Sequence, residues 1–172
     1  MTDSDSNVAA PATADFTKQD EAFMEIALEE ARLAGSAGDV PVGAVLVDQQ
    51  GCILARGRNT REIAGTALGH AEINAVADGC AALGGWRLSG CTLYVTLEPC
   101  PMCAGALMHA RVSRIVCGAA DPVAGAMGSV WALHRHPIEN THMSVEIGCL
   151  EMSCKDLIKQ FFYDRREASN KE

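Results

Sequence analysis

The sequence lacks any run of apolar residues near the roughly 20 that a membrane-spanning helix requires. It also lacks an export signal, because Met1 to Ala14 is acidic and has no basic start followed by an apolar stretch. No internal repeat, interior linker or glycine-rich nucleotide-binding loop is present. These absences predict a cytoplasmic protein that does not enter a membrane and uses no nucleotide cofactor.

The chain has 172 residues, of which 48% are hydrophobic, and this is enough for one domain with a full core. Its first residues are rich in Ala, Ser, Thr and acids, a composition typical of disorder. We therefore expect a disordered acidic tail over residues 1–15 and one folded domain over residues 16–168.

The net charge of −8 is unusual for a protein that binds nucleic acid, so its distribution along the chain matters. Residues 1–30 contain eight acids and one lysine, a balance of −7, which leaves −1 for the remaining residues. The body of the protein is therefore nearly neutral, and a local basic face remains possible.

Eight cysteines in a chain without an export signal indicate reduced thiols. Cys100 and Cys103 have the spacing of metal ligands. The other six have no such partner and are expected to be small buried hydrophobic residues: Cys52, Cys80, Cys91, Cys117, Cys149 and Cys154.

Apolar spacing and turn residues predict nine elements of secondary structure. The expected helices are Asp15 to Gly35, His70 to Leu83, Pro101 to His109 and Glu151 to Glu167. The expected strands are Val42 to Val47, Cys52 to Arg58, Thr92 to Leu97, Val112 to Cys117 and Ser144 to Leu150.

Strands that alternate with helices indicate an α/β domain with a sheet covered by helices. The first two strands are joined by a short turn and can pair antiparallel. The later strands are joined by helices and should be parallel. We therefore expect a mixed sheet of about five strands.

Two short motifs supply the chemistry. One is His70-Ala71-Glu72, and the other is Glu98-Pro99-Cys100-Pro101-Met102-Cys103, with thirty positions between His70 and Cys100. One imidazole and two thiols suit Zn²⁺ and leave a fourth position for water, while the spare carboxylate of Glu72 suits proton transfer. This arrangement is the signature of zinc-dependent nucleobase deaminases. It predicts one zinc ion per chain, with Glu72 as the catalytic residue.

Three other interpretations compete for these residues. Cys100 and Cys103 could form a redox pair, although such a pair needs neither Pro99 nor an upstream His-x-Glu. A structural zinc site would need a fourth ligand, for which His109 is available in principle. Glu98 is interpreted as a cap or loop acid without a catalytic role, and His134, His136 and His142 as surface or loop histidines.

From Asp20 to about Arg166 the sequence resembles the bacterial tRNA adenosine deaminases that act on the wobble base. The resemblance is carried by Val40 to Val47, Asn59, the two zinc motifs and Leu93 to Ala106. More specific to these enzymes are Gly118-Ala119 with Asp121, then Gly125 and Gly128-Ser129, and a late helix with Phe161-Phe162 and Arg165-Arg166.

The resemblance implies a three-layer α/β/α fold of the cytidine deaminase type, a homodimer, and adenosine-to-inosine conversion in a tRNA anticodon loop. It implies that Asn59 binds the base and that backbone near Val42 and Ala44 lines the pocket. It also implies RNA contacts by Asp121. Arg165 and Arg166 match the late helix, and their alternative interpretation is a solvated helix end.

The chain departs from the family pattern in two places. Thr66-Ala67-Leu68-Gly69 precedes the metal-binding histidine where the family usually has Asp-Pro-Thr-Ala, and apolar Ala120 and Val123 stand where a basic residue is common. An alternative function is a free nucleobase or nucleoside deaminase, for guanine or cytosine, with the same zinc site. A catalytically silent RNA-binding subunit is a further alternative, which the presence of Glu72 disfavours.

Overall fold

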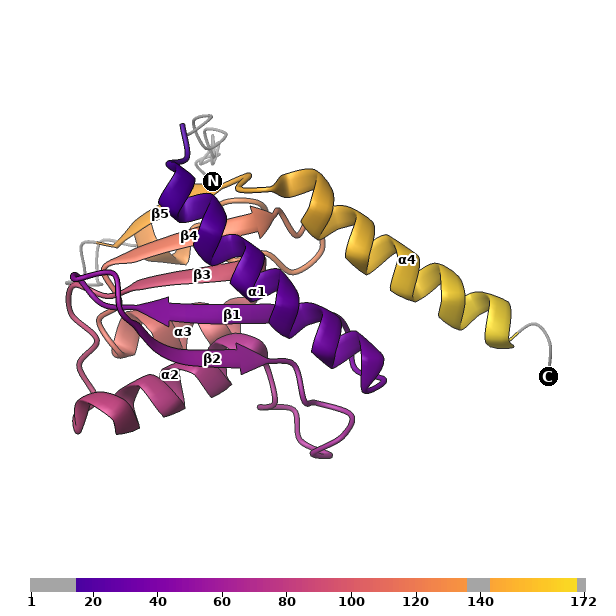
Figure 1. Ribbon diagram of the computed structural model, residues 1–172, viewed down its shortest axis with the longest axis horizontal. Helices are drawn as coiled ribbons and strands as arrows, with labels where there is room; N and C mark the ends of the chain where they lie inside the picture. Colours follow the sequence, from indigo (N-terminus) through magenta and orange to yellow (C-terminus); the bar gives the residue numbers. More distant parts are fainter. Residues whose placement is uncertain (1–14, 136–142, 170–172) are drawn as a thin grey trace, which may run out of the picture.

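The structure, a computed structural model, describes residues 15–135 and 143–169 (Figure 1). Apart from Asp15, the expected tail lies outside the described residues, as do His136 and His142. The helices are α1 (Lys18–Ser36), α2 (Ala71–Leu83), α3 (Pro101–His109) and α4 (Glu151–Ser169), with a 3₁₀ turn, η1, at Leu133–Arg135. The strands are β1 (Gly43–Val47), β2 (Ile53–Arg58), β3 (Thr92–Leu97), β4 (Arg114–Ala119) and β5 (Ser144–Ile147).

The five strands form one mixed sheet in the order β2-β1-β3-β4-β5. The β1–β2 hairpin is antiparallel, and the β3–β4 and β4–β5 pairs are parallel, as expected. The sequence did not predict that β1 also pairs antiparallel with β3, where Ala44 lies opposite Val95. This pairing places the hairpin beside the parallel strands in a single sheet.

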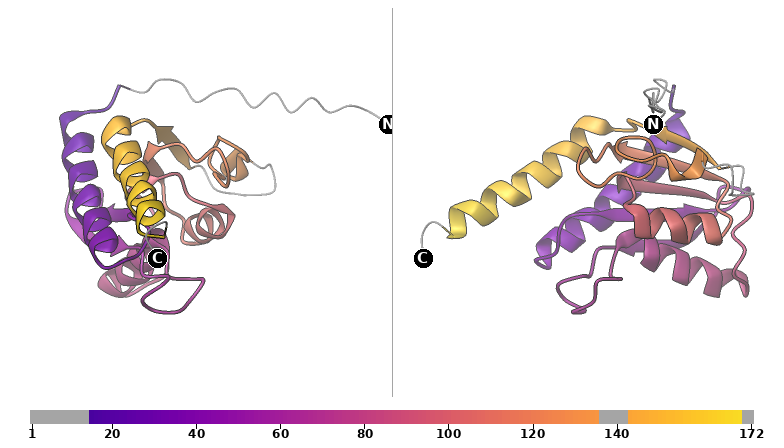
Figure 2. Two further views of the ribbon diagram at one scale, coloured as in Figure 1. Left: turned by 90° about the vertical axis from the view of Figure 1, so that its right-hand side faces the viewer. Right: turned by 180° about the vertical axis from the view of Figure 1, so that it is seen from behind.

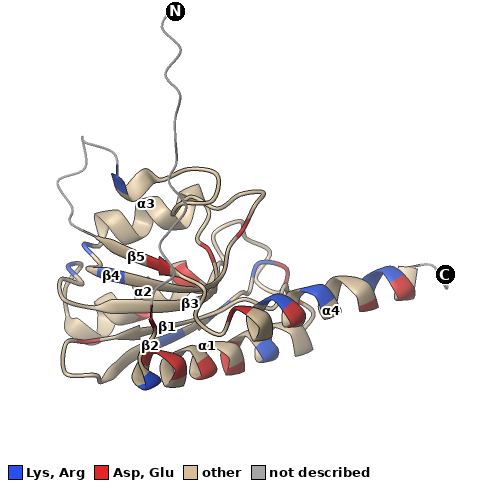
Figure 3. Cartoon of the chain, turned by 90° about the horizontal axis from the view of Figure 1, so that it is seen from above, with Lys and Arg blue, Asp and Glu red and all other residues tan. Residues whose placement is uncertain are grey.

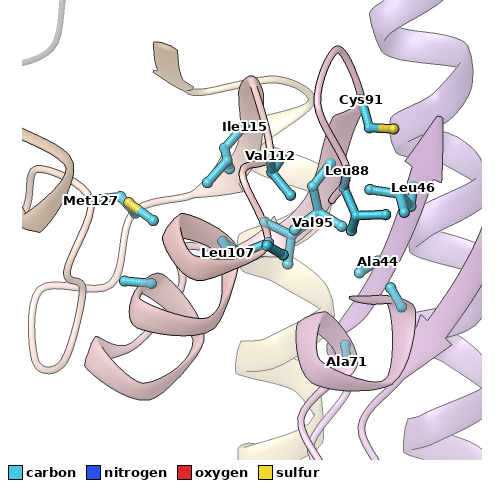
Figure 4. Close-up of a cluster of buried hydrophobic side chains, with 14 of the residues drawn as sticks. Ala44, Leu46, Ala71, Leu88, Cys91, Val95, Leu107, Val112, Ile115 and Met127 are labelled. Atoms are coloured by element: carbon cyan, nitrogen blue, oxygen red, sulfur yellow. The ribbon is translucent and has the colours of Figure 1, made fainter. Parts of the chain in front are cut away.

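The helices cover both faces of the sheet, which confirms the expected three-layer α/β/α architecture (Figures 1 and 2). Along β1, Ala44 and Leu46 face the core beneath α2 and α3, whereas Val45 and Val47 face the core beneath α1. The larger of these cores also contains Leu88, Leu107 and Ile115 (Figure 4). Successive residues of β1 point to opposite faces of the sheet. Because both faces are buried, the sequence of β1 is a continuous apolar run.

Several element boundaries differ from those expected, for local reasons. Strand β4 begins at Arg114 because Arg111 has a φ of 63° and the Val112 N–H still bonds the Leu107 carbonyl, so Val112 belongs to the turn after α3. The strand continues through Gly118 to Ala119, which pairs with Leu97. Strand β5 ends early because the next residue, Gly148, has a φ of 120°.

A partly buried ionic network links the start of α1 to the sheet. The Arg114 guanidinium donates to Asp20 Oδ1 at 2.6 Å and to Glu146 Oε2 at 2.6 Å, and the Tyr94 hydroxyl donates to Asp20 at 2.8 Å. Burial alone would raise the pKa of Asp20, but hydrogen bonds from Arg114, Thr17 and Tyr94 outweigh it and hold that pKa well below its usual range. The network joins α1, β3, β4 and β5.

All eight cysteines are free thiols. Cys91, Cys117, Cys149 and Cys154 are buried, as expected for small hydrophobic residues. Cys52 is exposed at the β1–β2 turn and Cys80 is half-buried, so the expectation was wrong for Cys52. Among the described residues, no helix is long and apolar enough to cross a membrane.

Candidate active site

Two helix N-termini meet at the predicted metal site. His70 is the N-cap of α2 and Cys100 is the N-cap of α3, and neither side chain caps its own helix. Pro101 occupies the first turn of α3, where a missing N–H costs nothing. Both side chains are therefore free to point beyond the helix ends toward a common ligand.

The three expected ligands come together with the geometry that zinc requires. His70 Nδ1 lies 3.5 Å from Cys103 Sγ and 3.7 Å from Cys100 Sγ, and all three ligand atoms lie within 4.8 Å of one another. Zn–S and Zn–N bonds at a tetrahedral angle place nitrogen and sulfur about 3.6 Å apart. The donor set and its spacing therefore fit one zinc ion.

The charge state of the two thiols is also suited to a cation. Hydrogen bonds from the Cys103 thiol and from the Cys103 and Met102 backbone lower the pKa of Cys100 to about 5. The neighbouring Cys100 sulfur and burial raise the pKa of Cys103. Without a cation the pair thus retains a proton that metal binding would release.

Glu72 lies in the first turn of α2 and is almost fully buried. Burial raises the pKa of its carboxyl, and the helix position keeps it beside the ligands without making it one of them. A carboxyl in such surroundings can both accept and donate a proton.

The geometry disfavours the other interpretations of the ligands. His109 is exposed at the far end of α3, and the described cluster contains three ligands and not four. His134 lies in η1, outside the cluster. A redox pair would not need His70 within 3.7 Å of both sulfurs.

A small cavity of about 190 Å³ opens beside the ligands. It is smaller than the about 300–1,000 Å³ of sites for drug-sized ligands, which suits a single base. Its walls include Asn59, Glu72 and Val42, three of the predicted site residues. Ala44, in contrast, is fully buried in the core beneath α2 and α3 and is not among the lining residues.

Asn59 lines this cavity and carries an unpaired acceptor. Its Nδ2 donates to the Val40 carbonyl at 3.2 Å and its backbone N–H to the Val42 carbonyl at 2.9 Å. Its Oδ1 is buried and has no partner among the described residues. A buried acceptor without a partner is costly, which points to a ligand that donates a hydrogen bond there.

Glu98 organises the loop that forms another wall. Its carboxylate accepts hydrogen bonds from the backbone N–H groups of Asp121, Met127 and Ser129 at 2.9–3.0 Å, and from the Ser129 hydroxyl. Gly125 is required here, since a Cβ would lie 2.5 Å from the Asp121 carbonyl oxygen and would overlap the Glu98 carboxylate. The interpretation of Glu98 as a loop acid is confirmed.

Asp121 and the two arginines of the late helix lie in different places. Asp121 lines the cavity, while its Oδ1 accepts from the Val123 and Ala124 N–H groups at 2.9 and 3.1 Å. Arg165 and Arg166 lie near the C-terminal end of α4, where they line a separate hollow with Phe162 and Ser169. Helix α4 extends beyond the sheet (Figure 1).

Sequence reasoning missed part of the cavity wall. Val40, Arg61 and Leu97 line it. Arg61 lies two residues after Asn59, in a loop whose course no local pattern predicted. That course depends on hydrogen bonds of the loop to Asp39 and on the close approach of Gly69 to Arg61.

A larger groove of about 570 Å³ adjoins the cavity. Val40, Leu97 and Asp121 line both. The opposite wall is one face of α4, formed by Lys155, Ile158, Lys159 and Phe162. The active-site cavity thus continues into a groove with two lysines.

Fold and site together define a zinc-dependent deaminase. Residues 17–119 match the family described as the cytidine and deoxycytidylate deaminase zinc-binding region, and the chain belongs to this family. The chain is 46% identical over 149 residues to the tRNA-specific adenosine deaminase of Bacillus subtilis, a match that covers 87% of this chain and 92% of the relative.

Two solved structures extend the comparison. One, from a study of A-to-I editing by tRNA:A34 deaminases at the wobble position of transfer RNA, has 43% identity and a TM-score of 0.76, and covers 79% of this chain and 98% of that chain. Another is the guanine deaminase of Nitrosomonas europaea, with 26% identity, a TM-score of 0.70 and coverage of 88% and 87%.

Proposed function

We propose that this protein hydrolyses adenosine to inosine at the wobble position of a tRNA anticodon loop. The observation that carries the proposal is the buried, unpaired Oδ1 of Asn59, a residue that lines the same cavity as Glu72 and two metal ligands. Identity of 43–46% to relatives named for this activity supports the choice of substrate. The enzyme is expected to act in the cytoplasm, where its free cysteines stay reduced.

His70, Cys100 and Cys103 would hold the zinc ion, which supplies a water molecule of lowered pKa as the nucleophile for C6 of the purine. Glu72 accepts a proton from this water and delivers protons to the ring nitrogen and to the departing amine, so that one water is consumed and one ammonia is released. Burial of Glu72 keeps bulk water from competing for these protons.

In this proposal Asn59 orients the base, since its Oδ1 accepts a hydrogen bond from the purine edge. The Nδ2 bond to Val40 occupies the amide nitrogen and leaves Oδ1 as the side-chain atom without a partner. Val42 contributes to the wall against the ring. The target base must leave its stack to enter, which costs less in a loop than in a duplex.

The groove along α4 is the proposed path of the RNA. Lys155, Lys159, Phe162 and Arg166 recur at helical spacing, so they share one face of α4. That face lines the groove beside the cavity and then the hollow with Arg165. These cations distinguish the groove from α1, whose exposed acids are Glu21, Glu25 and Glu29 (Figure 3).

A homodimer is part of the proposal. The exposed side of α3 carries Pro101, Met102, Gly105, Ala106 and His109, a small and uncharged surface. A Cβ at Gly105 would meet nothing within 4 Å, so this surface has room for close helix packing. Light scattering at micromolar concentration tests the dimer, and a mass near 18.2 kDa would contradict it.

The competing function is deamination of free guanine, because the chain is also similar to the guanine deaminase of Nitrosomonas europaea. The two functions separate in one experiment that offers the protein an anticodon stem-loop with wobble adenosine, free guanine and free cytosine. We expect inosine from the stem-loop and little ammonia from the free bases, because flanking nucleotides contribute binding energy to the transition state. Ammonia from guanine without inosine in the RNA would overturn the proposal.

A further inference from the structure

We propose that Arg61 binds a backbone phosphate next to the target nucleotide, and that the buried Asp39 is the positioning residue for its loop. This inference rests on the proposed function. It assigns a phosphate subsite to the loop between β2 and α2, a part of the chain that departs from the usual family sequence just before His70.

Arg61 stands at a place where a cation is needed. Among the residues that line the cavity it is the one arginine or lysine, whereas Glu72, Glu98 and Asp121 all contribute carboxyl groups. A nucleotide that inserts its base here carries its phosphates to the cavity mouth. A cation at the mouth would offset the repulsion between those phosphates and the nearby carboxyl groups.

The backbone of the loop is fixed from one side by Asp39. This residue is fully buried, and its Oδ1 and Oδ2 accept hydrogen bonds from the successive N–H groups of Glu62 and Ile63 at 3.0 and 3.2 Å. The Asp39 N–H itself donates to the Ala34 carbonyl at 3.0 Å. The end of α1 therefore holds the residues that directly follow Arg61.

Gly69 fixes the loop from the other side. The Thr60 N–H donates to the Gly69 carbonyl at 2.8 Å, which closes the loop on itself. A Cβ on Gly69 would lie 2.9 Å from the Arg61 backbone nitrogen and 3.0 Å from the Arg61 Cα. The two ends of the loop can therefore pack this closely only because residue 69 is a glycine. The Arg61 backbone is thus held before any substrate arrives.

The side chain of Arg61, in contrast to its backbone, is free to bind a ligand. Its ion pair among the described residues is with Glu62 at 4.0 Å, and both side chains are 60% exposed. Such an exposed ion pair contributes little to stability, so a phosphate can replace Glu62 as the partner of Arg61. A planar guanidinium on a fixed backbone suits bidentate binding of a phosphate.

The first test compares Arg61→Gln with the native enzyme on an anticodon stem-loop. We expect kcat/KM to fall about 10-fold to 100-fold, as for loss of a hydrogen bond to a charged group, and the salt dependence of RNA binding to become shallower by about one counterion. The matched control is Arg87→Gln, whose guanidinium lies on Trp86 at the opposite end of α2. Equal effects of the two variants would overturn the proposal.

The second test locates the phosphate. Each phosphate that flanks the target adenosine is replaced in turn by an uncharged methylphosphonate. At one position the native enzyme should lose as much activity as Arg61→Gln does, and the variant should lose no more. Additive losses at every position would overturn the phosphate contact. A native enzyme that forms no inosine in the unmodified stem-loop would instead refute the proposed function.

Asp39 is tested by Asp39→Asn and Asp39→Glu. Asp39→Asn should raise KM for the stem-loop with a smaller effect on kcat, flatten the salt dependence as Arg61→Gln does, and leave zinc content unchanged. Asp39→Glu, which keeps a carboxylate, should restore part of the affinity. A loss of stability in Asp39→Asn with unchanged KM and salt dependence would show that Asp39 serves folding alone.

Discussion

Arg114 Nη1 lies 2.6 Å from Asp20 Oδ1, although 94 positions separate the two residues in the sequence. The same guanidinium bonds Glu146 on the edge strand β5. One side chain thus joins the first helix to the last strand, on the face of the sheet that α1 and α4 cover.

Replacement of Arg114 by Met should lower the free energy of unfolding at pH 7 by about 3 kcal/mol, because it leaves the Asp20 carboxylate buried without its partner. Native Asp20 has a pKa well below its usual range, so its contribution is complete above the unfolded pKa of about 3.9 and is lost only as pH falls from there through the lower pKa of the folded protein. The difference between native and variant proteins, measured by urea unfolding, should therefore begin to shrink at about pH 4 and be clearly smaller at about pH 3.

Zinc loss at low pH affects both proteins and cancels in this comparison. A stability difference that stays constant from pH 7 to about pH 3 would show that the Asp20–Arg114 pair is not the source of the effect.

Glu98→Gln should disturb the loop from Asp121 to Ser129. The glutamine amide can supply one acceptor oxygen where the carboxylate serves four hydrogen-bond donors from that loop. We expect a loss of about 1–3 kcal/mol in stability and faster hydrogen exchange of the Met127 and Ser129 amides. Unchanged exchange at these amides would mean that Glu98 does not organise the loop.

Arg165→Glu with Arg166→Glu tests the groove along α4. Both side chains are exposed, so the fold and zinc content should be kept. Affinity for tRNA should fall and its salt dependence should flatten, since fewer counterions are released on binding. If tRNA affinity is unaltered across a salt titration, these arginines form a solvated helix end and nothing more.

Asn59→Ala tests base recognition. It removes the buried, unpaired Oδ1 of a residue that lines the cavity and also the Nδ2 bond to Val40. We expect activity on the stem-loop to fall about 100-fold or more, with zinc content unchanged and a modest loss of stability. Asn59→Asp keeps an acceptor at this position and is the matched variant. Full activity in Asn59→Ala would return Asn59 to the role of a loop residue.

Much of the fold could be predicted because it is encoded locally. The alternation in Thr92 to Leu97 and the turn at Gly51 indicate a strand and a hairpin without knowledge of their neighbours. The metal ligands were equally accessible, since His70 and Cys100 each precede a helix and their spacing is a chemical requirement.

The remaining features depend on contacts between distant segments. Three examples are the pairing of β1 with β3, the hydrogen bond from Glu62 to Asp39, and the Arg114 network. They join residues 23 to 94 positions apart, and such contacts leave no periodic pattern in the sequence. For the same reason Arg61 could not be placed at the cavity from the sequence, because its position depends on how Asp39 and Gly69 fold the loop.

The most direct measurement pairs zinc content with inosine at the wobble position of tRNA, for the native protein, Glu72→Ala and Cys103→Ala. The native protein should hold about one zinc per chain and form inosine. Glu72→Ala should keep its zinc and lose activity by about 100-fold to 10,000-fold, whereas Cys103→Ala should lose both. An active Glu72→Ala enzyme, or a Cys103→Ala protein that keeps its zinc, would contradict the separation of metal binding from proton transfer on which the account rests.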